Sequence, residues 1–277
     1  MVKKNKPFFI DKTRKKYYDE VACEKLSFCN DIKYLNPKKG VVSVDDNRWK
    51  EAQEYEKKIW MKDFKFVADD NDKKNKDSFN NYSALDGKIF DNVIELGCGP
   101  FTNLRYILSH IKCKKIDLLD PLIKDYIKKY NCAYKHGLIS GDNVWRNRFF
   151  GSKKQVNLYN FSIEEFVVDK KYDLIIMINV LEHCKDFEII KKKILSMSKK
   201  GSYFVFSDKI FNLDQIKQNL KNTYDSGHPL RVDKKYLMKF LKDNFRKIYW
   251  RTQKIETYRG NRDLSHMKFY YIGEKIF

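Results

Sequence analysis

The stretch Val93-Ile-Glu-Leu-Gly-Cys-Gly-Pro-Phe-Thr-Asn103 decides the fold of this chain. Its first four residues are apolar except for Glu95, as in a buried strand, and Gly97 and Gly99 then interrupt the pattern. Beyond them, apolar residues recur at helical spacing as far as Ile111. Two glycines at alternate positions permit a sharp turn and a close approach of a ligand to the backbone. The stretch therefore predicts a strand, a ligand-binding turn and a helix, the arrangement at which open α/β sheets bind ligands.

Predicted strands and helices alternate from residue 92 onward, which indicates a parallel sheet covered by helices on both faces. The predicted strands are 93–96, 115–119, 155–161, 172–178 and 202–206, and the predicted helices are 101–111, 123–130, 186–197, 213–221 and 234–244. Residues 132–154 are expected to be mostly loop. Two late strand-like runs, 246–251 and 268–272, lack a crossover helix between them, so they are expected to pair antiparallel. We therefore predict a Rossmann-like doubly wound sheet of about seven strands, mostly parallel, with an antiparallel C-terminal strand.

Residues 1–81 are predicted to form a basic, helical appendage to a main domain over residues 82–277. A helix is expected over 45–66, because Trp49, Trp60 and other apolar residues fall on one face. Residues 68–81 are almost purely polar and indicate a linker. Two interpretations of the helix stay open: it packs on the main domain, or it forms a lid over the ligand.

The net charge of +20 arises from 47 Lys and 10 Arg against 37 acidic residues. Recognition of phosphates and bases favours arginine, whose planar fork binds bidentately, so this lysine excess is more typical of a solvated surface. The excess is uneven, however, since residues 191–277 carry 21 basic and 8 acidic residues. An acidic partner for the C-terminal third therefore remains an alternative.

No apolar run approaches the roughly 18 residues that a membrane span requires, and the N-terminus lacks the apolar segment of a signal peptide. The six cysteines are scattered without a C-x-x-C pair. We therefore expect a cytoplasmic protein with reduced thiols, and no metal site is predicted.

The kind of ligand follows from the residues around the glycines. Asp120 lies 21 residues after Gly99, at the end of the second predicted strand, where an acid can accept both hydroxyls of a ribose. Dinucleotide sites have a third glycine that brings a helix close to the pyrophosphate, and Thr102 stands at that position here. No lysine follows the glycines as in a phosphate loop. The turn therefore predicts a ligand with a sugar but no phosphate, and it disfavours a nicotinamide-dependent oxidoreductase.

Several motifs together resemble the class I S-adenosylmethionine-dependent methyltransferases. Residues 95–99, Glu-Leu-Gly-Cys-Gly, are similar to that family's motif I (E/D-x-G-x-G), and Asp120 matches its ribose-binding acid. Residues 173–183, Asp-Leu-Ile-Ile-Met-Ile-Asn-Val-Leu-Glu-His, resemble the fourth strand and the loop after it, which often ends in L-E-H in the subgroup with small-molecule and sugar substrates. Lys200-Gly201 resembles the motif before the fifth strand. The resemblance covers residues 90–208.

The resemblance implies S-adenosylmethionine as cofactor. The residues that it implies for cofactor binding are Glu95, Gly97, Cys98, Gly99, Asp120, Pro121, Ser162, Ile163, Asn179 and Glu182. Ser162 stands where many relatives hold the adenine amino group with an Asp, and it is the weaker acceptor. Ile163 is expected to pack against the adenine ring.

A hydroxyl acceptor benefits from a base, and histidine is the default base at neutral pH. His183, in the loop after the fourth strand, and His228, in a Gly/Pro-punctuated loop, are the candidate catalytic residues, although a structural role fits each equally well. Tyr224 and Arg231 flank His228 and are candidate substrate contacts. We predict in-line transfer of a methyl group to a hydroxyl or amine of a small molecule or of a sugar or glycan.

Two alternatives remain. The basic C-terminal third would suit a methyltransferase of RNA, either a cap or a tRNA. Against it, Asn179 stands where the catalytic tetrad of ribose 2′-O-methyltransferases has an acid, and the N-P-P-Y-like signature of base amino-methyltransferases is absent. A non-catalytic partner subunit with the same fold is the second alternative, but such a protein would be expected to lose Gly97, Gly99 and Asp120, which are all present.

Overall fold

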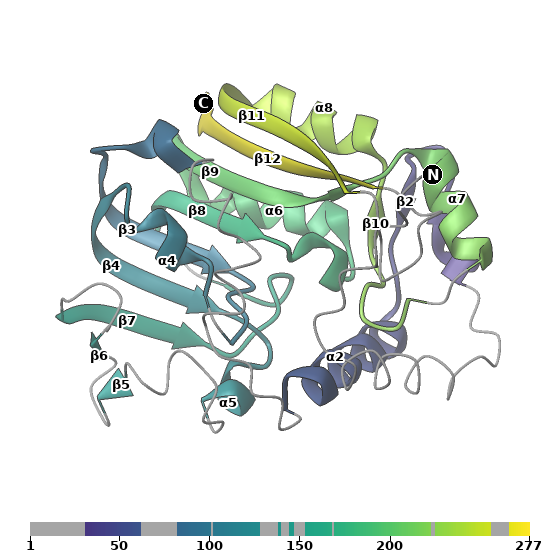
Figure 1. Cartoon of the computed structure of the whole chain (residues 1–277), viewed down its shortest axis with the longest axis horizontal. Coiled ribbons are helices and arrows are strands. Elements are labelled where there is room, and N and C mark those ends of the chain that lie inside the picture. Colours follow the sequence, from purple (N-terminus) through teal and green to yellow (C-terminus); the bar gives the residue numbers. More distant parts are fainter. Residues whose placement is uncertain are drawn as a thin grey trace, which may run out of the picture.

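A nine-stranded sheet with the order β11-β12-β9-β8-β3-β4-β7-β6-β5 forms the centre of the computed structural model, over the residues that it describes (Figure 1). The described residues are 31–61, 82–100, 102–127, 138–139, 144–146, 153–167, 169–222, 225–255 and 266–277. The strands of this sheet are β3 (Ile89–Leu96), β4 (Lys112–Leu119), β5 (Leu138–Ile139), β6 (Val144–Arg146), β7 (Lys153–Tyr159), β8 (Tyr172–Ile178), β9 (Ser198–Ile210), β11 (Phe245–Ile255) and β12 (His266–Lys275).

The pairing of these strands confirms the predicted fold. β3 pairs in parallel with β4 and β8, β4 with β7, and β8 with β9. β12 lies between β9 and β11 and is antiparallel to both. The short strands β5 and β6 extend the opposite edge in antiparallel fashion, so part of the predicted loop 132–154 is strand. Parallel strands place their carboxyl ends at one edge of the sheet, and the glycine turn lies at that edge.

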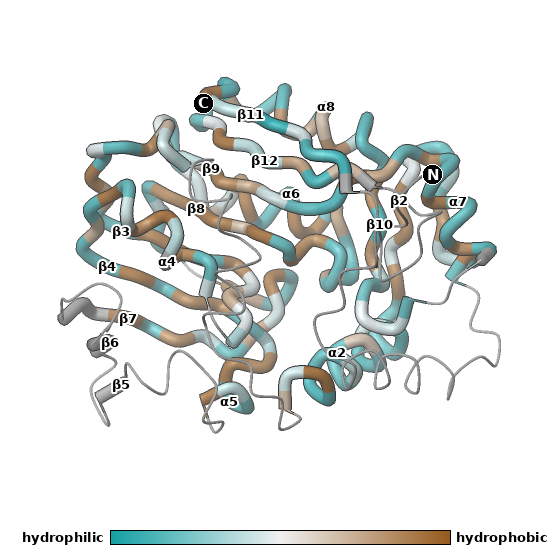
Figure 2. The backbone as a smooth tube through the Cα atoms, viewed as in Figure 1, coloured by the Kyte–Doolittle hydropathy of each residue, from teal (hydrophilic) through white to brown (hydrophobic). Residues whose placement is uncertain are grey.

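Helices cover both faces, because alternate residues of each central strand point to opposite sides. Ile94 of β3 packs in the cluster that contains α6 (Phe187–Met197) and α8 (Lys234–Asn244). Its neighbour Val93 packs in the cluster that contains α4 (Leu104–Ile107) and α5 (Ile123–Tyr126). Figure 2 shows the hydrophobic residues along the central strands β3, β4 and β8. The sheet is therefore doubly wound, as predicted.

The helix after the glycine turn is shorter than the predicted 101–111. α4 begins at Leu104 and ends at Ile107, after which the chain turns over residues 108–110 to enter β4. The carbonyl of His110 in this turn accepts the N–H of Gly87. Because α4 ends early, the turn before β4 can form this hydrogen bond with Gly87, which lies just before β3.

The N-terminal described segment, residues 31–61, contains η1 (Asp31–Tyr34), β1 (Leu35–Asn36), β2 (Val41–Val42) and α2 (Asp46–Met61). β2 pairs antiparallel with β1 and with β10 (Arg231–Val232), which follows α7 (Leu213–Asn222). The buried guanidinium of Arg48 binds the carboxylate of Asp31 and the carbonyls of Asp225 and Ser226. Residues 31–61 are thus joined to the segment between β9 and α8. The predicted linker 68–81 lies outside the described residues.

None of the helices in the described part of the chain is long and apolar enough to cross a membrane.

Candidate active site

The glycine turn after β3 has a backbone conformation that suits glycine. Gly97 has a φ of +68° and Gly99 a φ of +55°. A Cβ on Gly97 would lie 3.0 Å from the Cβ of Val180 and closer still to both of its methyl carbons. A Cβ on Gly99 would meet nothing within 4 Å. The N–H groups of Gly97 and Cys98 both donate to the carbonyl of Leu119, so the turn is anchored to the end of β4.

The side chain of Glu95 connects the end of β3 to the residues that follow the glycine turn. Its fully buried carboxylate accepts hydrogen bonds from the hydroxyl of Thr102, from the N–H of Asn103 at 2.7 Å and from the N–H of Leu104 at 3.3 Å. These donors belong to the start of α4, whose first N–H groups lack partners within the helix. Glu95 holds the start of α4 and does not line the cavity described next, so its predicted contact with the cofactor stays a prediction.

A cavity of about 430 Å³ lies between the glycine turn and α2. Nine of the predicted site residues line it: Gly97, Cys98, Gly99, Asp120, Pro121, Ser162, Ile163, Asn179 and His183. α2 supplies Trp49, Gln53, Glu56 and Trp60 to the other side. We predicted one apolar face for this helix, but it has two adjacent ones. The face with Ala52 and Tyr55 is buried in the protein, and the face with the two tryptophans lines the cavity.

Asp120 places a carboxylate at the end of β4, beside the glycine turn. Its Oδ2 accepts the N–H of Gly99 at 3.0 Å and its Oδ1 accepts the N–H of Leu122 at 2.8 Å. Burial raises the pKa of Asp120 to about 6, although the two N–H donors oppose the shift. Each carboxylate oxygen can accept more than one hydrogen bond, so acceptor capacity remains for a ligand.

Ser162 and Ile163 follow β7 and line the same cavity. The hydroxyl of Ser162 donates to the carboxylate of Glu165 at 3.0 Å and accepts the N–H of Glu165 at 3.2 Å. The hydroxyl therefore closes a local turn, and its contact with adenine stays a prediction. Ile163 is buried and supplies an apolar wall.

The loop after β8 brings Asn179 and His183 to the cavity. Asn179 has a φ of +58°, a conformation that asparagine tolerates better than most residues, and its N–H donates to the carbonyl of Ser207. The carboxylate of Asp208 accepts the N–H groups of Val180 and Leu181, the two residues after Asn179. The carbonyl of His183 accepts hydrogen bonds from Trp49 and Gln53 of α2, and its ring Nδ1 lies 3.0 Å from the carbonyl of Gly227.

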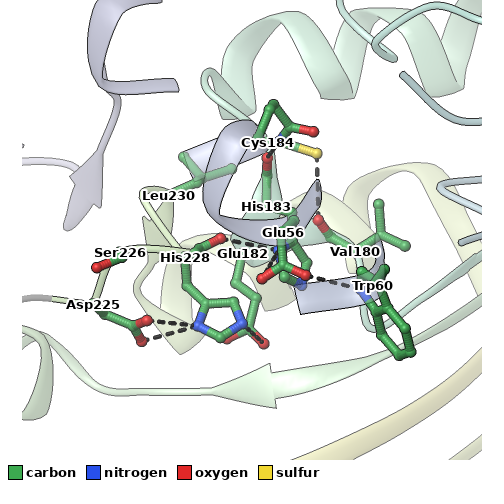
Figure 3. Close-up of polar contacts among 12 residues, drawn as sticks. Glu56, Trp60, Val180, Glu182, His183, Cys184, Asp225, Ser226, His228 and Leu230 are labelled. Carbon is green, nitrogen blue, oxygen red and sulfur yellow. Dashed lines mark hydrogen bonds and ion pairs between the residues drawn. The ribbon is translucent and has the colours of Figure 1, made fainter. Parts of the chain in front are cut away.

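The candidate residues Glu182, His228 and Arg231 form a buried cluster outside the cavity lining. Figure 3 shows Glu182 and His228 of this cluster beside His183. Nδ1 of His228 lies 2.8 Å from Oδ1 of Asp225, and its Nε2 lies 3.2 Å from Oε1 of Glu182. The guanidinium of Arg231 binds the Asp225 carboxylate at 2.9 Å and the carbonyls of His228 and Leu230. In this structure Arg231 therefore holds the loop before β10, and neither Arg231 nor Glu182 lines the cavity, so their predicted ligand contacts stay predictions.

Glu182 is the most unusual acid of this cluster. Burial would raise its pKa, but the charges of His228 and Lys209 outweigh that effect, so the pKa of Glu182 is lowered and the group is ionised at neutral pH. Lys209 donates to Oε1, whereas Oε2 is buried and has no hydrogen-bond partner in the described part of the chain. The predicted substrate contact Tyr224 lies outside the described residues.

The chain matches the family model described as a methyltransferase domain over residues 49–253. It belongs to the class I S-adenosylmethionine-dependent methyltransferases. A search of curated proteins finds no match. Among solved structures, the N-methyltransferase NodS from Bradyrhizobium japonicum WM9, in complex with S-adenosyl-L-homocysteine, is similar with a TM-score of 0.53 and 14% identity, covering 82% of this chain and 99% of NodS. The YcgJ protein from Bacillus subtilis has a TM-score of 0.51 and 10% identity, covering 73% of this chain and 99% of YcgJ. At these identities the likeness shows the fold of this methyltransferase and nothing finer.

The buried position of Arg231 leads to a prediction. Arg231→Ala is expected to lower the free energy of unfolding by about 3 kcal/mol, because it removes the buried guanidinium that binds the carboxylate of Asp225 and the carbonyls of His228 and Leu230. Chemical denaturation measures the effect. Lys239→Ala is the control, since it breaks an exposed pair with Asp243 that contributes at most about 0.5 kcal/mol. An Arg231→Ala variant of normal stability that fails only in substrate binding would contradict the structural role.

Proposed function

We propose that this methyltransferase transfers a methyl group from S-adenosylmethionine to a hydroxyl or amine of a small molecule or sugar. The observation that carries the proposal is the charge of the cavity lining. Glu56, Asp120 and Glu164 contribute carboxylates to it, and Lys268 is the only lysine or arginine among the described lining residues. Carboxylates accept hydrogen bonds from hydroxyl and ammonium groups, whereas they repel the phosphates of a nucleic acid.

The cavity suits the cofactor. Its volume of about 430 Å³ lies within the roughly 300–1,000 Å³ of sites that bury a small ligand. The space beside Gly99 is open, so backbone groups of the turn can approach the methionine portion. Asp120 and Ile163 both line the cavity, and in this proposal Asp120 accepts the ribose hydroxyls while Ile163 packs against the adenine.

The acceptor is expected at the side of the cavity that α2 closes. Trp49 and Trp60 provide flat aromatic surfaces there, and Glu56 and His183 provide polar groups. The sulfonium of the cofactor already makes its methyl group electrophilic, so the main task of the protein is to hold the acceptor atom in line and close to that carbon. A compact cavity with aromatic walls and a few polar groups meets this requirement for a small acceptor.

Methyl-labelled S-adenosylmethionine tests this proposal. We expect the full chain to transfer label to the ultrafiltered small-molecule fraction of a cell extract and not to total RNA, and the Asp120→Ala variant to transfer none. Label recovered in RNA would overturn the small-molecule proposal and favour the use of the basic C-terminal third.

The raised pKa of Asp120 predicts how cofactor affinity changes with pH. In the free protein this pKa is about 6. Ribose hydroxyls donate to the ionised carboxylate, so cofactor binding lowers the pKa and releases a proton when the pH is below about 6. Affinity should therefore rise about tenfold from pH 5 to pH 7 and level off above it. Titration calorimetry measures this profile. The Asp120→Asn variant should bind more weakly and with little pH dependence, and a flat profile for the natural protein would contradict the role of Asp120.

A further inference from the structure

Glu56, His183 and His228 bring three potential metal ligands together from separate segments of the chain. Glu56 belongs to α2, His183 to η3 (Leu181–His183), and His228 to the loop before β10. One ring nitrogen of each histidine and one carboxylate oxygen of Glu56 all lie within 4.8 Å of one another. Ligands on opposite sides of an ion lie about 4–4.4 Å apart when each bond is about 2.0–2.2 Å long. Small side-chain shifts would therefore close this group around one ion.

Neighbouring groups hold each ligand in place. Both carboxylate oxygens of Asp225 lie within 2.9 Å of Nδ1 of His228, and the indole N–H of Trp60 donates to Oε2 of Glu56 at 3.0 Å. Nδ1 of His183 lies 3.0 Å from the carbonyl of Gly227 and 3.7 Å from Oε1 of Glu56. Metal-binding histidines are usually oriented by a carboxylate or carbonyl on the nitrogen that does not bind the ion, as Asp225 orients His228.

The contacts of His228 also favour a cation. When Nδ1 of His228 donates its hydrogen to Asp225, the neutral ring has its lone pair on Nε2, which lies only 3.2 Å from Oε1 of Glu182. Oε2 of Glu182 is buried, and no described residue forms a hydrogen bond with it. A positive charge beside Nε2 would relieve this contact. That charge is either a proton on His228 or a metal ion.

We propose that Glu56, His183 and His228 bind one divalent first-row transition-metal ion beside the methyl-transfer site. Two imidazoles and a carboxylate suit ions such as Mn²⁺, Fe²⁺, Co²⁺ and Zn²⁺. Glu56 and His183 line the cavity, whereas His228 lies behind them. The protein ligands therefore leave open coordination positions on the cavity side, as catalytic metal sites do.

The role of the ion in catalysis rests on the proposed function. An acceptor hydroxyl bound to the ion would lose its proton to water near neutral pH, because a metal ion lowers the pKa of a coordinated oxygen. The resulting alkoxide oxygen forms a bond to the methyl carbon of S-adenosylmethionine. The bond from that carbon to sulfur breaks, and its electron pair remains on sulfur to give S-adenosylhomocysteine. The sequence pattern does not reveal this site, because its ligands are 127 and 45 residues apart, from 56 to 183 and from 183 to 228.

Cobalt binding to the full chain tests the proposal directly. After treatment with a chelator and its removal, the protein is titrated with Co²⁺ alone, followed by calorimetry and by the visible absorption of the ion. We expect about one ion per chain, with an affinity at least tenfold lower in Glu56→Gln and in His228→Gln. His110→Gln is the matched control, since His110 pairs with Asp86 at the other end of β4. Glu56→Gln keeps the size of the side chain and an oxygen that can accept the indole N–H of Trp60, so this variant tests the site even if His228→Gln unfolds.

The outcomes separate the site from the function. If Co²⁺ does not bind, or binds equally well to the Glu56 and His110 variants, the metal site is wrong and His228 is an imidazolium between Asp225 and Glu182. If the site binds Co²⁺ but methyl transfer to the small-molecule fraction proceeds at the same rate with a chelator present, the catalytic role of the ion is wrong. If Co²⁺ binds and no small molecule is methylated, the site stands and the proposed acceptor class fails.

Discussion

Asp120→Ala is expected to weaken S-adenosylmethionine binding by at least about 100-fold. Each hydrogen bond from a ribose hydroxyl to a carboxylate contributes about 1.5–3 kcal/mol, and a loss of 1.4 kcal/mol is a tenfold loss of affinity. Two such bonds give the predicted change. The variant also removes the acceptor of the Gly99 N–H, so the second half of the glycine turn loses an anchor.

The fold of this variant should survive. The pKa of Asp120 in the folded protein is about 6, above the ordinary value of 3.8 for an aspartate side chain. An acid with a raised pKa makes the protein less stable as the pH rises from about 4 to 6, because the buried carboxylate must lose its proton. At pH 7 removal of this charge therefore offsets part of the loss of the two N–H hydrogen bonds. The expected defect is in binding, with a smaller change in stability.

Titration calorimetry with S-adenosylmethionine and thermal unfolding of the same preparation check both statements. Asp125→Ala is the control, because Asp125 lies in α5 near the site and forms a partly exposed pair with Lys57. Its affinity should stay within threefold of the natural protein. An Asp120→Ala variant that binds the cofactor as well as the control would remove Asp120 from the cofactor site.

The parts of the fold that sequence could predict are those whose signal is local. β8 coincides with the predicted strand 172–178 because all but one of its residues are buried, which requires a continuous apolar run. β9 is longer than the predicted 202–206 at both ends. Its last residues pair with β12, where Met267 lies opposite Ile210. This partner strand is more than 50 residues further along the chain. A strand end that depends on such a partner carries little local signal.

The same distinction explains the site. Gly97, Gly99 and Asp120 could be located because they lie at the ends of strands that the sequence predicts. The glycine turn follows β3 directly, and Asp120 follows β4 directly. The sequence pattern predicts ligand contacts for Arg231 and Glu182, yet in the structure each binds groups of the protein itself. A charged residue has the same sequence signature in both roles. The two roles can be told apart only in the folded protein, where Asp225 pairs with Arg231 and Lys209 pairs with Glu182. Such partners are needed because a buried charge is costly unless it is paired.

Gly97→Ala and Gly99→Ala are expected to separate stability from cofactor binding. Both positions have positive φ, which costs about 1–2 kcal/mol for any residue with a Cβ. At Gly97 the new methyl group also overlaps the side chain of Val180, and overpacking adds about 1–3 kcal/mol. Gly97→Ala should therefore lower the free energy of unfolding by about 2–5 kcal/mol. Gly99→Ala meets no protein atom, so it should cost only about 1–2 kcal/mol of stability.

The new methyl group of Gly99→Ala stands in the lining of the cofactor cavity, so this milder variant should lose S-adenosylmethionine affinity while it remains folded. Chemical denaturation and calorimetry of both variants measure the contrast. The double variant Gly97→Ala/Val180→Ala should recover part of the lost stability, because residues in contact are energetically coupled. If Gly97→Ala is no less stable than Gly99→Ala, the contact with Val180 does not limit residue 97, and the turn tolerates a side chain. The glycine would then be required for the ligand alone, and the two substitutions would differ only in how much cofactor affinity they remove.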